Sequence, residues 1–432
     1  MITKQKGTYD VIGIDAKKRK YVCDVIDAIC EKYNYSYIET PIFESSELFH
    51  RSVGESSDIV TKETYDFKDR GDRMITLRPE GTAGVVRSFI ENKLYGNMTE
   101  PFKVYYNGPM FRYERPQSGR TRQFTQFGIE CIGTDDVMSD AEIISLAYNT
   151  YKLLGIDVSV RINSLGDNES RDNYRKALID YFTPIIDNLC EDCKERLNKN
   201  PLRILDCKVD AESDYLKNSP KTLDYLNEES KKRFEKLQEY LELMDIDYEI
   251  DTNLVRGLDY YNHTVFEIIG NIPEFGNANV LGGGGRYNGL VKELDGPEVP
   301  AVGFAMGLDR TILAMETLNI NFKIKEDIDL FIMYGNEDEK DTATYLIQDL
   351  RLNGFSVETD LMNKSFKNQF KSADRFNAKY LIILNSEDIK QYKVKVKDNM
   401  TKEEELVDIN DLVDYLDTKM WGKIKNGYKR YI

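Results

Sequence analysis

The chain has 432 residues, a length that normally forms two or three domains, and 41% of its residues are hydrophobic. Its charged content of 31% is typical of a soluble surface, and its formal net charge of −16 argues against a general nucleic-acid coat protein, which would normally be basic. No apolar run approaches the ~18–20 residues that a membrane helix needs. The first residues form no apolar signal segment either, so we expect a cytoplasmic protein that does not enter a membrane.

The cysteine and histidine contents restrict the possible chemistry. Six cysteines in so long a chain do not indicate a disulfide scaffold. Cys190 and Cys193 form a CxxC pair with Cys207 downstream, but zinc would need a fourth ligand, and neither His50 nor His263 lies nearby in the sequence. We therefore expect ordinary thiols and no zinc. The scarcity of histidine also disfavours a Ser-His-Asp triad, so the chemistry should rely on arginines and carboxylates.

The N-terminal segment is expected to contain a helix followed by a hairpin. Asp15 can cap a helix that runs to about Tyr33, and Asn34 suits its end. Residues 63–67 and 73–77 alternate around a polar turn, a pattern that predicts two paired strands.

The segment LRPEGTAGVVRSFIENK places Glu80 and Thr82 directly before an apolar-periodic helix. One interpretation is that the two side chains form an N-terminal cap. The other is that they stand at a helix entrance beside a ligand. The sequence of this segment does not decide between the two.

The stretch NGPMFRYERPQSGRTRQFTQFGIEC reads as two strands, residues 102–114 and 122–132, joined by a basic turn. Residues two apart on a strand share a face, so Gln126 and Glu130 point one way, and the first strand adds Arg112. The opposite face is mostly apolar and suits a core. A surface hairpin that carries charge only for solubility remains an alternative. The core-facing set comprises Thr125, Phe127, Ile129 and Cys131.

Residues 167–249 have a different composition from their surroundings. They are rich in Lys, Glu, Asp and Leu with helical periodicity, which predicts a mostly helical insertion. Its charges are better explained as a solvated helix face than as a binding site.

A compact turn at Arg256 and a run of glycines follow. LVRGLDYYNHTVFEI sets Arg256 beside a glycine and two tyrosines, Tyr260 and Tyr261, and a packed structural tyrosine corner is the alternative to a binding role. Residues 282–285 are four consecutive glycines, which let a backbone pack closely on a ligand or on another strand. The run lacks the GK[ST] ending of a P-loop and the βαβ surroundings of a dinucleotide fingerprint.

The last part of this core reads as a strand, residues 302–305, and a helix that begins near Gly307 with Arg310 in its first turns. A helix N-terminus with a nearby arginine favours anions. From residue 328, strands and helices alternate, which predicts a separate α/β domain with a parallel or mixed sheet. The basic tail beyond residue 417 carries interleaved aromatics that suit RNA contact, although solvated terminal charge explains it equally well.

Arginine-bearing and carboxylate-bearing segments thus come from distant parts of one core. A site that combines them would bind a polyanion beside a small cationic or hydrogen-bonding group, and ATP with an amino acid fits that description. The segments carry Arg112, Arg120, Arg122, Arg256, Arg310, Glu80 and Glu130.

Over nearly its whole length the chain resembles the histidyl-tRNA synthetase family of class II aminoacyl-tRNA synthetases, of the bacterial type. FESSELFHRSVGESSDIV resembles motif 1, the dimer-forming region. GPMFRYERPQSGRTRQFTQFGIE resembles motif 2, and VGFAMGLDR resembles motif 3. LVRGLDYY and GGGGRYNGL resemble the histidine-specific signatures, which are far more specific than the class II motifs.

The resemblance implies a histidine–tRNA ligase, which activates L-histidine with ATP and passes it to the 3′ end of tRNA(His). Arg112 and Arg256 would be the catalytic residues, Arg256 acting at the α-phosphorus. ATP would be bound by Arg112, Glu114, Arg120 and Arg310. Histidine would be bound by Glu80, Thr82, Gln126, Glu130, Arg256, Tyr260, Tyr261 and Tyr287.

The resemblance also implies partners and an architecture. Mg²⁺ would accompany ATP, Arg115 and Gln117 would approach the tRNA acceptor end, and the chain would be a homodimer. The implied fold is an α+β catalytic domain with a mainly antiparallel sheet flanked by helices. It would span residues 1–325 with a helical insertion at about 170–250. Residues 326–432 would be an anticodon-binding α/β domain with a mixed sheet.

Three positions depart from the family pattern, and two other functions are possible. Thr121 replaces a common aromatic residue, Asp309 replaces the usual glutamate of motif 3, and Thr125 stands where His or Asn is frequent. These departures put loop geometry and the position of Arg310 in question. One alternative is a synthetase-like regulatory subunit of histidine biosynthesis, but such subunits generally lack the C-terminal domain and the intact arginine signature. The other is a class II synthetase for another amino acid, against which LVRGLDYY argues.

Overall fold

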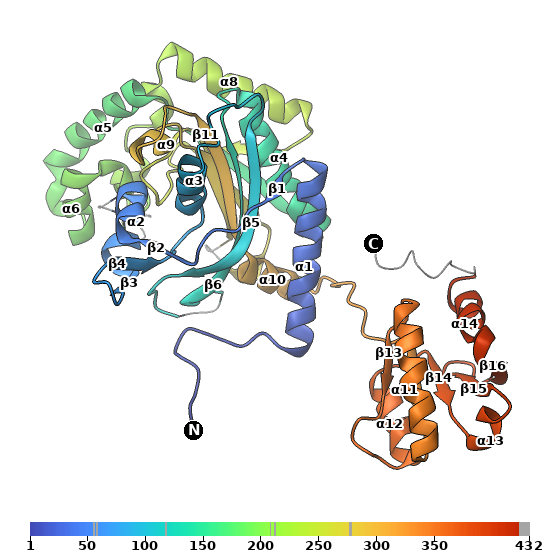
Figure 1. Cartoon of the computed structure of the whole chain (residues 1–432). Helices are drawn as coiled ribbons and strands as arrows, with labels where there is room; N and C mark the ends of the chain where they lie inside the picture. Colours follow the sequence, from blue (N-terminus) through green and yellow to red (C-terminus); the bar gives the residue numbers. More distant parts are fainter. Residues whose placement is uncertain are drawn as a thin grey trace. The chain divides into compact units, whose positions relative to one another are not determined.

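The computed structural model describes residues 1–54, 57, 59–116, 119–207, 209–210, 213–275 and 279–422. The chain divides into two units, Met1–Lys323 and Ile324–Ile432, and each is described by itself. Figure 1 shows a large sheet surrounded by helices in the first unit and a smaller sheet with its own helices in the second. The expected fold class is confirmed in both.

An eight-stranded sheet forms the centre of the first unit. In spatial order its strands are β1 (Ser36–Tyr37), β5 (Phe102–Phe111), β6 (Gln123–Ile132), β11 (Ala301–Gly307), β10 (Val280–Arg286), β9 (Asn262–Gly270), β7 (Val158–Ser164) and β8 (Tyr248–Ile250). The edge pairs β1–β5 and β7–β8 are parallel, and the pairings between them are antiparallel. This arrangement places the β5–β6 hairpin beside β11 and β10, which follow it late in the chain.

The β5–β6 hairpin has the side-chain alternation expected from its sequence. Gly108 lies opposite Gln126, and Val104 lies opposite Glu130. The apolar face of β6 is buried, while Gln126 and Glu130 point to a cavity on the other face. β5 ends at Phe111 rather than near residue 114, so Arg112 follows the strand directly.

Helices cover the sheet on the side of the apolar hairpin face. α4 (Val137–Leu153) packs on β11, β7 and β9, while α1 (Gly13–Lys32) packs on α4 and on α10 (Leu308–Thr317). α1 begins earlier than expected, and Asp15 lies in its first turn instead of capping it. There its charge still favours the positive end of the helix dipole. The end of α1 is as expected, because Asn34 adopts a left-handed conformation with φ of 59°.

A small second sheet lies beside the central one. Its strands are β2 (Phe43–Ser45), β4 (Met74–Leu77) and β3 (Tyr65–Lys68), in that order, which confirms the expected hairpin. A π-helical turn, η1 (Ile59–Glu63), precedes β3. α2 (Ser46–Val53) packs on this sheet, and it also packs with α3 (Thr82–Glu91) and α9 (Leu290–Glu293), which contact each other.

The insertion is mostly helical, as its composition predicts. Its elements are α5 (Asn168–Phe182), η2 (Thr183–Asn188), α6 (Glu191–Lys199), η3 (Pro201–Ile204), α7 (Asp214–Lys217), η4 (Thr222–Tyr225) and α8 (Glu228–Leu243). α8 packs against α4, and α5, α6 and η3 surround a small apolar core of their own. The insertion is therefore joined to the sheet and also carries a separate hydrophobic cluster.

The second unit is an α/β domain with a mixed sheet. Its strands are β13 (Val357–Thr359), β12 (Leu330–Met333), β14 (Tyr380–Ile383), β15 (Lys393–Asp398) and β16 (Glu404–Asp408), in that order. The first three strands are parallel and the last two antiparallel. Its helices are α11 (Glu337–Leu352), α12 (Phe366–Arg375), α13 (Ser386–Ile389) and α14 (Leu412–Trp421), with the 3-10 turn η6 (Ile409–Asp411) before α14.

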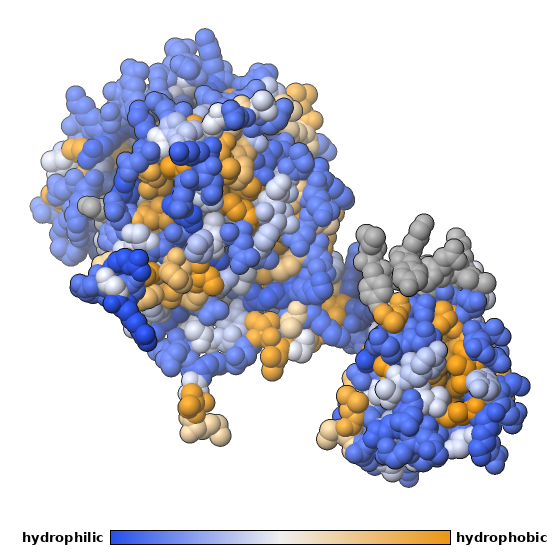
Figure 2. Space-filling model, viewed as in Figure 1, coloured by the Kyte–Doolittle hydropathy of each residue, from blue (hydrophilic) through white to orange (hydrophobic). Residues whose placement is uncertain are grey.

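The surfaces of both units are mainly polar on the face that Figure 2 shows, with hydrophobic residues in smaller groups. Among the described residues, no helix is both long and apolar enough to cross a membrane. The basic tail from residue 423 onward lies outside the described residues. Lys419, at its start, pairs with Glu405 at 2.6 Å.

Candidate active site

A cavity of about 240 Å³ opens over the polar face of the β5–β6 hairpin. Its walls come from the entrance of α3, from β6, β10 and β11, and from the turn before β9. Segments that are far apart in the sequence therefore meet around one space. The predicted site residues that line it are Glu80, Thr82, Arg112, Gln126, Glu130, Arg256, Tyr260, Tyr261 and Tyr287.

Glu130 is the centre of a buried hydrogen-bond network. The Thr82 hydroxyl donates to its Oε1 at 2.7 Å, and the Tyr287 hydroxyl donates to its Oε2 at 2.5 Å. Tyr106 also donates to Oε1 at 3.4 Å. Burial, together with the nearby charge of Glu80, raises the pKa of Glu130 to about 8, although these hydrogen bonds oppose the shift. A ligand that offers an N–H group or a positive charge would meet a carboxyl group already held in place, and a positive charge would favour its ionised form.

Glu80 caps α3 and lines the cavity at the same time. Its carboxylate accepts hydrogen bonds from the backbone N–H groups of Thr82 at 2.7 Å and Ala83 at 2.8 Å. Burial raises the pKa of Glu80 above its ordinary value despite these bonds. The side-chain oxygen of Gln126 accepts from the Gly81 N–H at 3.1 Å. The capping interpretation and the ligand interpretation of this segment are therefore compatible.

The tyrosines of the Arg256 turn pack against one another and also line the cavity. The rings of Tyr260 and Tyr261 have centroids 4.6 Å apart, and Tyr260 meets Tyr287 edge-on at 5.5 Å. All three are buried, with exposed fractions of 7%, 7% and 1%. The tyrosine cluster thus forms a rigid wall of the cavity as well as part of the core.

Two glycines make room for the charged groups of the site. A Cβ added at Gly283 would lie 2.6 Å from Nη1 of Arg256, and one added at Gly303 would overlap the carboxylate of Glu130. The glycine run therefore lets another group lie close to its backbone, as the sequence predicts, and here that group is the Arg256 guanidinium, which lies directly on the strand.

Arg256 is held by an acid that the sequence did not single out. Its guanidinium pairs with Glu267 on β9, and a side-chain exposed fraction of 22% shows that it is largely enclosed. Burial, the largest single influence, lowers the pKa of Arg256, but the charge and hydrogen bond of Glu267 together with the nearby Tyr261 and Asp206 outweigh it, and the pKa is raised overall. Arg256 is thus a fixed, permanently charged group. The available sequence signal was one carboxylate within the otherwise apolar stretch VFEII.

Arg112 lies at the mouth of the same cavity. Its Nε donates to the Pro79 carbonyl at 2.9 Å, and its guanidinium lies 5.4 Å from the centre of the Phe124 ring. One hydrogen bond and one aromatic face therefore orient the cation, while its remaining N–H groups are available for an anion.

The other predicted ATP-binding residues form a second group that does not line this cavity. Arg120 and Glu114 lie 3.6 Å apart, and the Arg310 guanidinium lies 5.4 Å from the centre of the Phe275 ring. Burial, and next the positive charge of Arg120, lowers the pKa of Arg310. Two cations that repel each other favour an anion between them.

Sequence comparison decides the family. Residues 7–311 match the family described as histidyl-tRNA synthetase, and residues 329–419 match the one described as anticodon binding domain. The chain belongs to the histidyl-tRNA synthetase family.

Curated relatives and a solved structure support this assignment over nearly the whole chain. The histidine–tRNA ligases of Bacillus licheniformis and Bacillus cytotoxicus are each 50% identical, over 96% of this chain and 98% of each relative. The crystal structure of apo Staphylococcus aureus histidyl-tRNA synthetase matches with a TM-score of 0.84 and 42% identity, covering 96% of this chain and 100% of that one. The resemblance drawn from the motifs is confirmed.

The two positions that the sequence predicts to approach tRNA are less defined. Arg115 is exposed in the loop after Arg112, as a residue that meets a macromolecule should be. Gln117 lies outside the described residues. The hydroxyl of Thr121, the unusual residue of this loop, donates to the Gln123 carbonyl at 2.7 Å and so closes a local turn.

Asp309, the second departure from the family pattern, anchors the start of the synthetase chain. Its carboxylate pairs with Arg19 of α1 and accepts a hydrogen bond from the Tyr9 hydroxyl. It also accepts from the Thr125 N–H at 2.9 Å. Burial and the Asp309 charge raise the pKa of Tyr9 to about 12. The shorter side chain is therefore engaged with α1 and β6, a role that no local pattern revealed.

The room that Gly303 leaves for Glu130 gives a testable consequence. Gly303→Ala is expected to destabilise the synthetase by about 1–3 kcal/mol, because the new methyl group collides with the buried carboxylate. It should also weaken histidine binding. Urea unfolding and the KM for histidine measure the two effects. Gly289→Ala is the matched control, since nothing lies within 4 Å of its added Cβ. Equal stability of both variants would contradict this assignment.

Proposed function

We propose that this chain activates L-histidine with ATP to give histidyl-adenylate and pyrophosphate, and then transfers histidine to the 3′ end of tRNA(His). The observation that supports this best is that one cavity contains both an enclosed carboxyl group, Glu130, and a fixed cation, Arg256. A carboxylate suits an imidazole, and the cation suits the phosphate that the histidine carboxylate attacks.

Histidine would be recognised at both of its polar ends. The imidazole N–H groups would pair with Glu130 and with the Tyr261 hydroxyl, and the packed tyrosines would enclose the ring. The amino group would meet Glu80, Thr82 and Gln126 at the entrance of α3. A site whose buried polar groups pair with an imidazole rejects amino acids that leave these groups unpaired, by as much as ~10⁴–10⁵.

ATP would lie across the two arginine groups. Arg112 would hold the α-phosphate, and Phe124 offers an aromatic face that suits the adenine ring. Arg120 and Arg310 would hold the far phosphates, which would relieve the repulsion between the two cations. Mg²⁺ keeps mostly water and phosphate oxygens as ligands and needs only one or two carboxylates, so Glu114 beside Arg120 fits it. When bound, Mg²⁺ neutralises phosphate charge.

The activation step needs positioning and charge stabilisation more than a general base. A carboxylate oxygen of histidine attacks the α-phosphorus in line, and the bond to pyrophosphate breaks. Negative charge grows on the α-phosphate oxygens during the attack. Arg256 is positioned by Glu267 before the substrates arrive, so it stabilises this charge without reorganisation.

The transfer step joins the product to RNA. The terminal ribose hydroxyl of tRNA attacks the histidyl carbonyl and AMP leaves. Arg115 and Gln117 would meet the acceptor end. Residues 1–325 would form the catalytic domain and residues 326–432 the anticodon-binding domain.

We also propose a cytoplasmic homodimer. The motif 1 region contributes β2 to the small β2–β4–β3 sheet, and that sheet exposes large apolar side chains that a second copy would cover. The exposed fractions are 56% for Phe43, 45% for Phe67 and 46% for Met74.

ATP–pyrophosphate exchange with each standard amino acid tests the proposed function. We expect exchange with histidine and a kcat/KM at least about 10³-fold lower with any other amino acid, because only an imidazole satisfies Glu130 and Tyr261 together. A folded protein that gives no exchange with histidine would instead favour the regulatory-subunit alternative. Exchange with threonine, proline or glycine would favour another class II specificity.

A further inference from the structure

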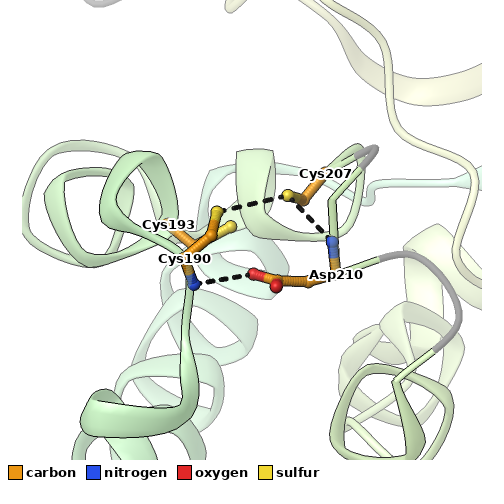
Figure 3. Close-up of side chains that lie close together, drawn as sticks. All are labelled: Cys190, Cys193, Cys207 and Asp210. Carbon is orange, nitrogen blue, oxygen red and sulfur yellow. Dashed lines mark hydrogen bonds between the residues drawn. The ribbon is translucent and has the colours of Figure 1, made fainter.

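Three thiols and one carboxylate meet in the insertion, outside the candidate active site. Their ligand atoms all lie within 4.8 Å of one another. Figure 3 shows that the side chains come from the start of α6 and from the loop after η3. We call this group the cysteine–aspartate cluster, and it consists of Cys190, Cys193, Cys207 and Asp210.

The spacing within the cluster matches that of a single tetrahedral ion. Zinc–sulfur bonds of about 2.3 Å in a tetrahedron place neighbouring sulfurs about 3.8 Å apart. The Sγ atoms of Cys190 and Cys207 are 3.6 Å apart, and no pair of ligand atoms exceeds 4.8 Å. The fourth ligand, which the sequence argument against zinc found missing among the histidines, is available as a carboxylate.

Backbone hydrogen bonds orient two of the four groups. The Cys190 N–H donates to Oδ2 of Asp210 at 3.1 Å, and the Asp210 N–H donates to Sγ of Cys207 at 3.4 Å. Such hydrogen bonds from groups that do not themselves bind the ion fix the direction of metal ligands. Three members are nearly inaccessible, with exposed fractions of 0% for Cys193, 4% for Cys207 and 7% for Asp210.

The cluster is better suited to a cation than to a disulfide. A disulfide would use two sulfurs and leave a third buried thiol and a buried carboxylate beside it. A thiophilic divalent cation would convert all four groups into ligands at once.

We propose that the cysteine–aspartate cluster binds one Zn²⁺ ion, which fixes the loop after η3 to the start of α6. Each thiol that binds gives its proton to the solvent, so protons compete with the metal. Affinity for Zn²⁺ should fall at least about tenfold between pH 8 and pH 6.

η3, which the loop directly follows, contacts the Arg256 turn, so the ion would also support the active site. Nε of Arg203, in η3, lies 3.1 Å from Oδ1 of Asp259, and its Nη2 donates to the Gly257 carbonyl at 2.7 Å. The charge of Asp206, next to Cys207, contributes to the raised pKa of Arg256. Loss of the ion should therefore slow catalysis without changing any residue of the cavity.

The first experiment titrates the reduced, chelator-treated full chain with Zn²⁺ alone. We expect one equivalent to bind with a Kd below about 100 nM at pH 7.5. Zn²⁺ should protect three of the six thiols from a thiol reagent. Substitution with Co²⁺ should give the intense visible absorption of a tetrahedral thiolate site. Cys207→Ser should lose this binding, whereas Cys23→Ser, whose thiol lies on α1 away from the cluster, should retain it.

A second variant covers the case in which Cys207→Ser does not fold. Asp210→Asn keeps the three thiols and the side-chain volume, and we expect it to bind Zn²⁺ at least about tenfold more weakly with altered Co²⁺ absorption. The unfolding temperature of the unsubstituted protein should rise with Zn²⁺ and stay constant with Mg²⁺. The proposal fails if the reduced protein binds less than 0.1 equivalent, if all variants bind alike, or if mass spectrometry finds the cluster cysteines joined as a disulfide in the isolated protein.

Discussion

Replacing Arg256 with alanine is expected to lower kcat/KM for histidine activation by about 10²–10³-fold while the fold and the proposed dimer persist. Arg256 is positioned by Glu267 and lies directly on Gly283, so the cation is already in place when charge develops on the α-phosphate. Its removal takes a stabilising charge from the transition state, and no other residue of the turn can replace it. ATP–pyrophosphate exchange measures the activity, and light scattering with circular dichroism measures the assembly and fold.

Two further variants separate a catalytic from a structural Arg256. Arg161→Ala is the matched control, because Arg161 lies on the same sheet and pairs with the exposed Glu249 at 3.1 Å. It should retain activity. Glu267→Gln keeps the charge of Arg256 but removes the carboxylate that holds its position, and it should lower kcat more than it raises KM. An unfolded Arg256→Ala protein with an active Glu267→Gln protein would mean that the arginine is structural.

Glu130→Gln is expected to raise the KM for histidine by about 10²–10⁴-fold. Only the oxygen of the amide can accept a hydrogen bond. Its NH₂ group would face a hydroxyl, of Thr82 or Tyr287, that now donates to the carboxyl group. ATP binding should change little, because the phosphates meet other residues. The histidine dependence of exchange at fixed ATP measures the change. An unaltered KM would remove Glu130 from the imidazole site.

The same substitution should stabilise the fold at alkaline pH. The pKa of Glu130 is about 8 in the folded protein against an ordinary value of 4.5. Between these values the folded state holds a proton that the unfolded state has lost, so the free energy of unfolding falls as the pH rises. The free energy of unfolding of Glu130→Gln should therefore exceed that of the unsubstituted protein by roughly 2–4 kcal/mol at pH 8, and by far less at pH 5.

Denaturant unfolding across this pH range measures the stability difference. Glu249→Gln, on the exposed edge strand β8, is the control and should leave the pH dependence unchanged. A Glu130→Gln protein that is equally or less stable at pH 8 would show that the carboxyl is already ionised at low cost. The activity and stability effects have opposite signs, which is typical of a residue kept for binding.

Strong local patterns in the sequence predicted much of the fold. Alternation in the β5–β6 hairpin correctly assigned Gln126 and Glu130 to one face and Phe127 and Ile129 to the other, because side-chain parity on a strand is a local property. Strand–helix alternation after residue 328 likewise predicted the mixed sheet. Element ends were less certain, as the cap of α1 shows, because several residues near a helix start can satisfy its N–H groups.

The histidine-specific motifs of the sequence correctly indicated the family. Side-chain alternation on the strands, together with these motifs, identified most of the residues that line the cavity. Only the tertiary structure decided which partners hold the charged groups. Glu267 fixes Arg256, Tyr106 and Tyr287 fix Glu130, and Asp309 engages Arg19. The cysteine–aspartate cluster is another such case, since Asp210 looks like one of many acids in a charged insertion. These contacts join residues from different elements, and their geometry depends on how those elements pack, which no local pattern along the chain contains.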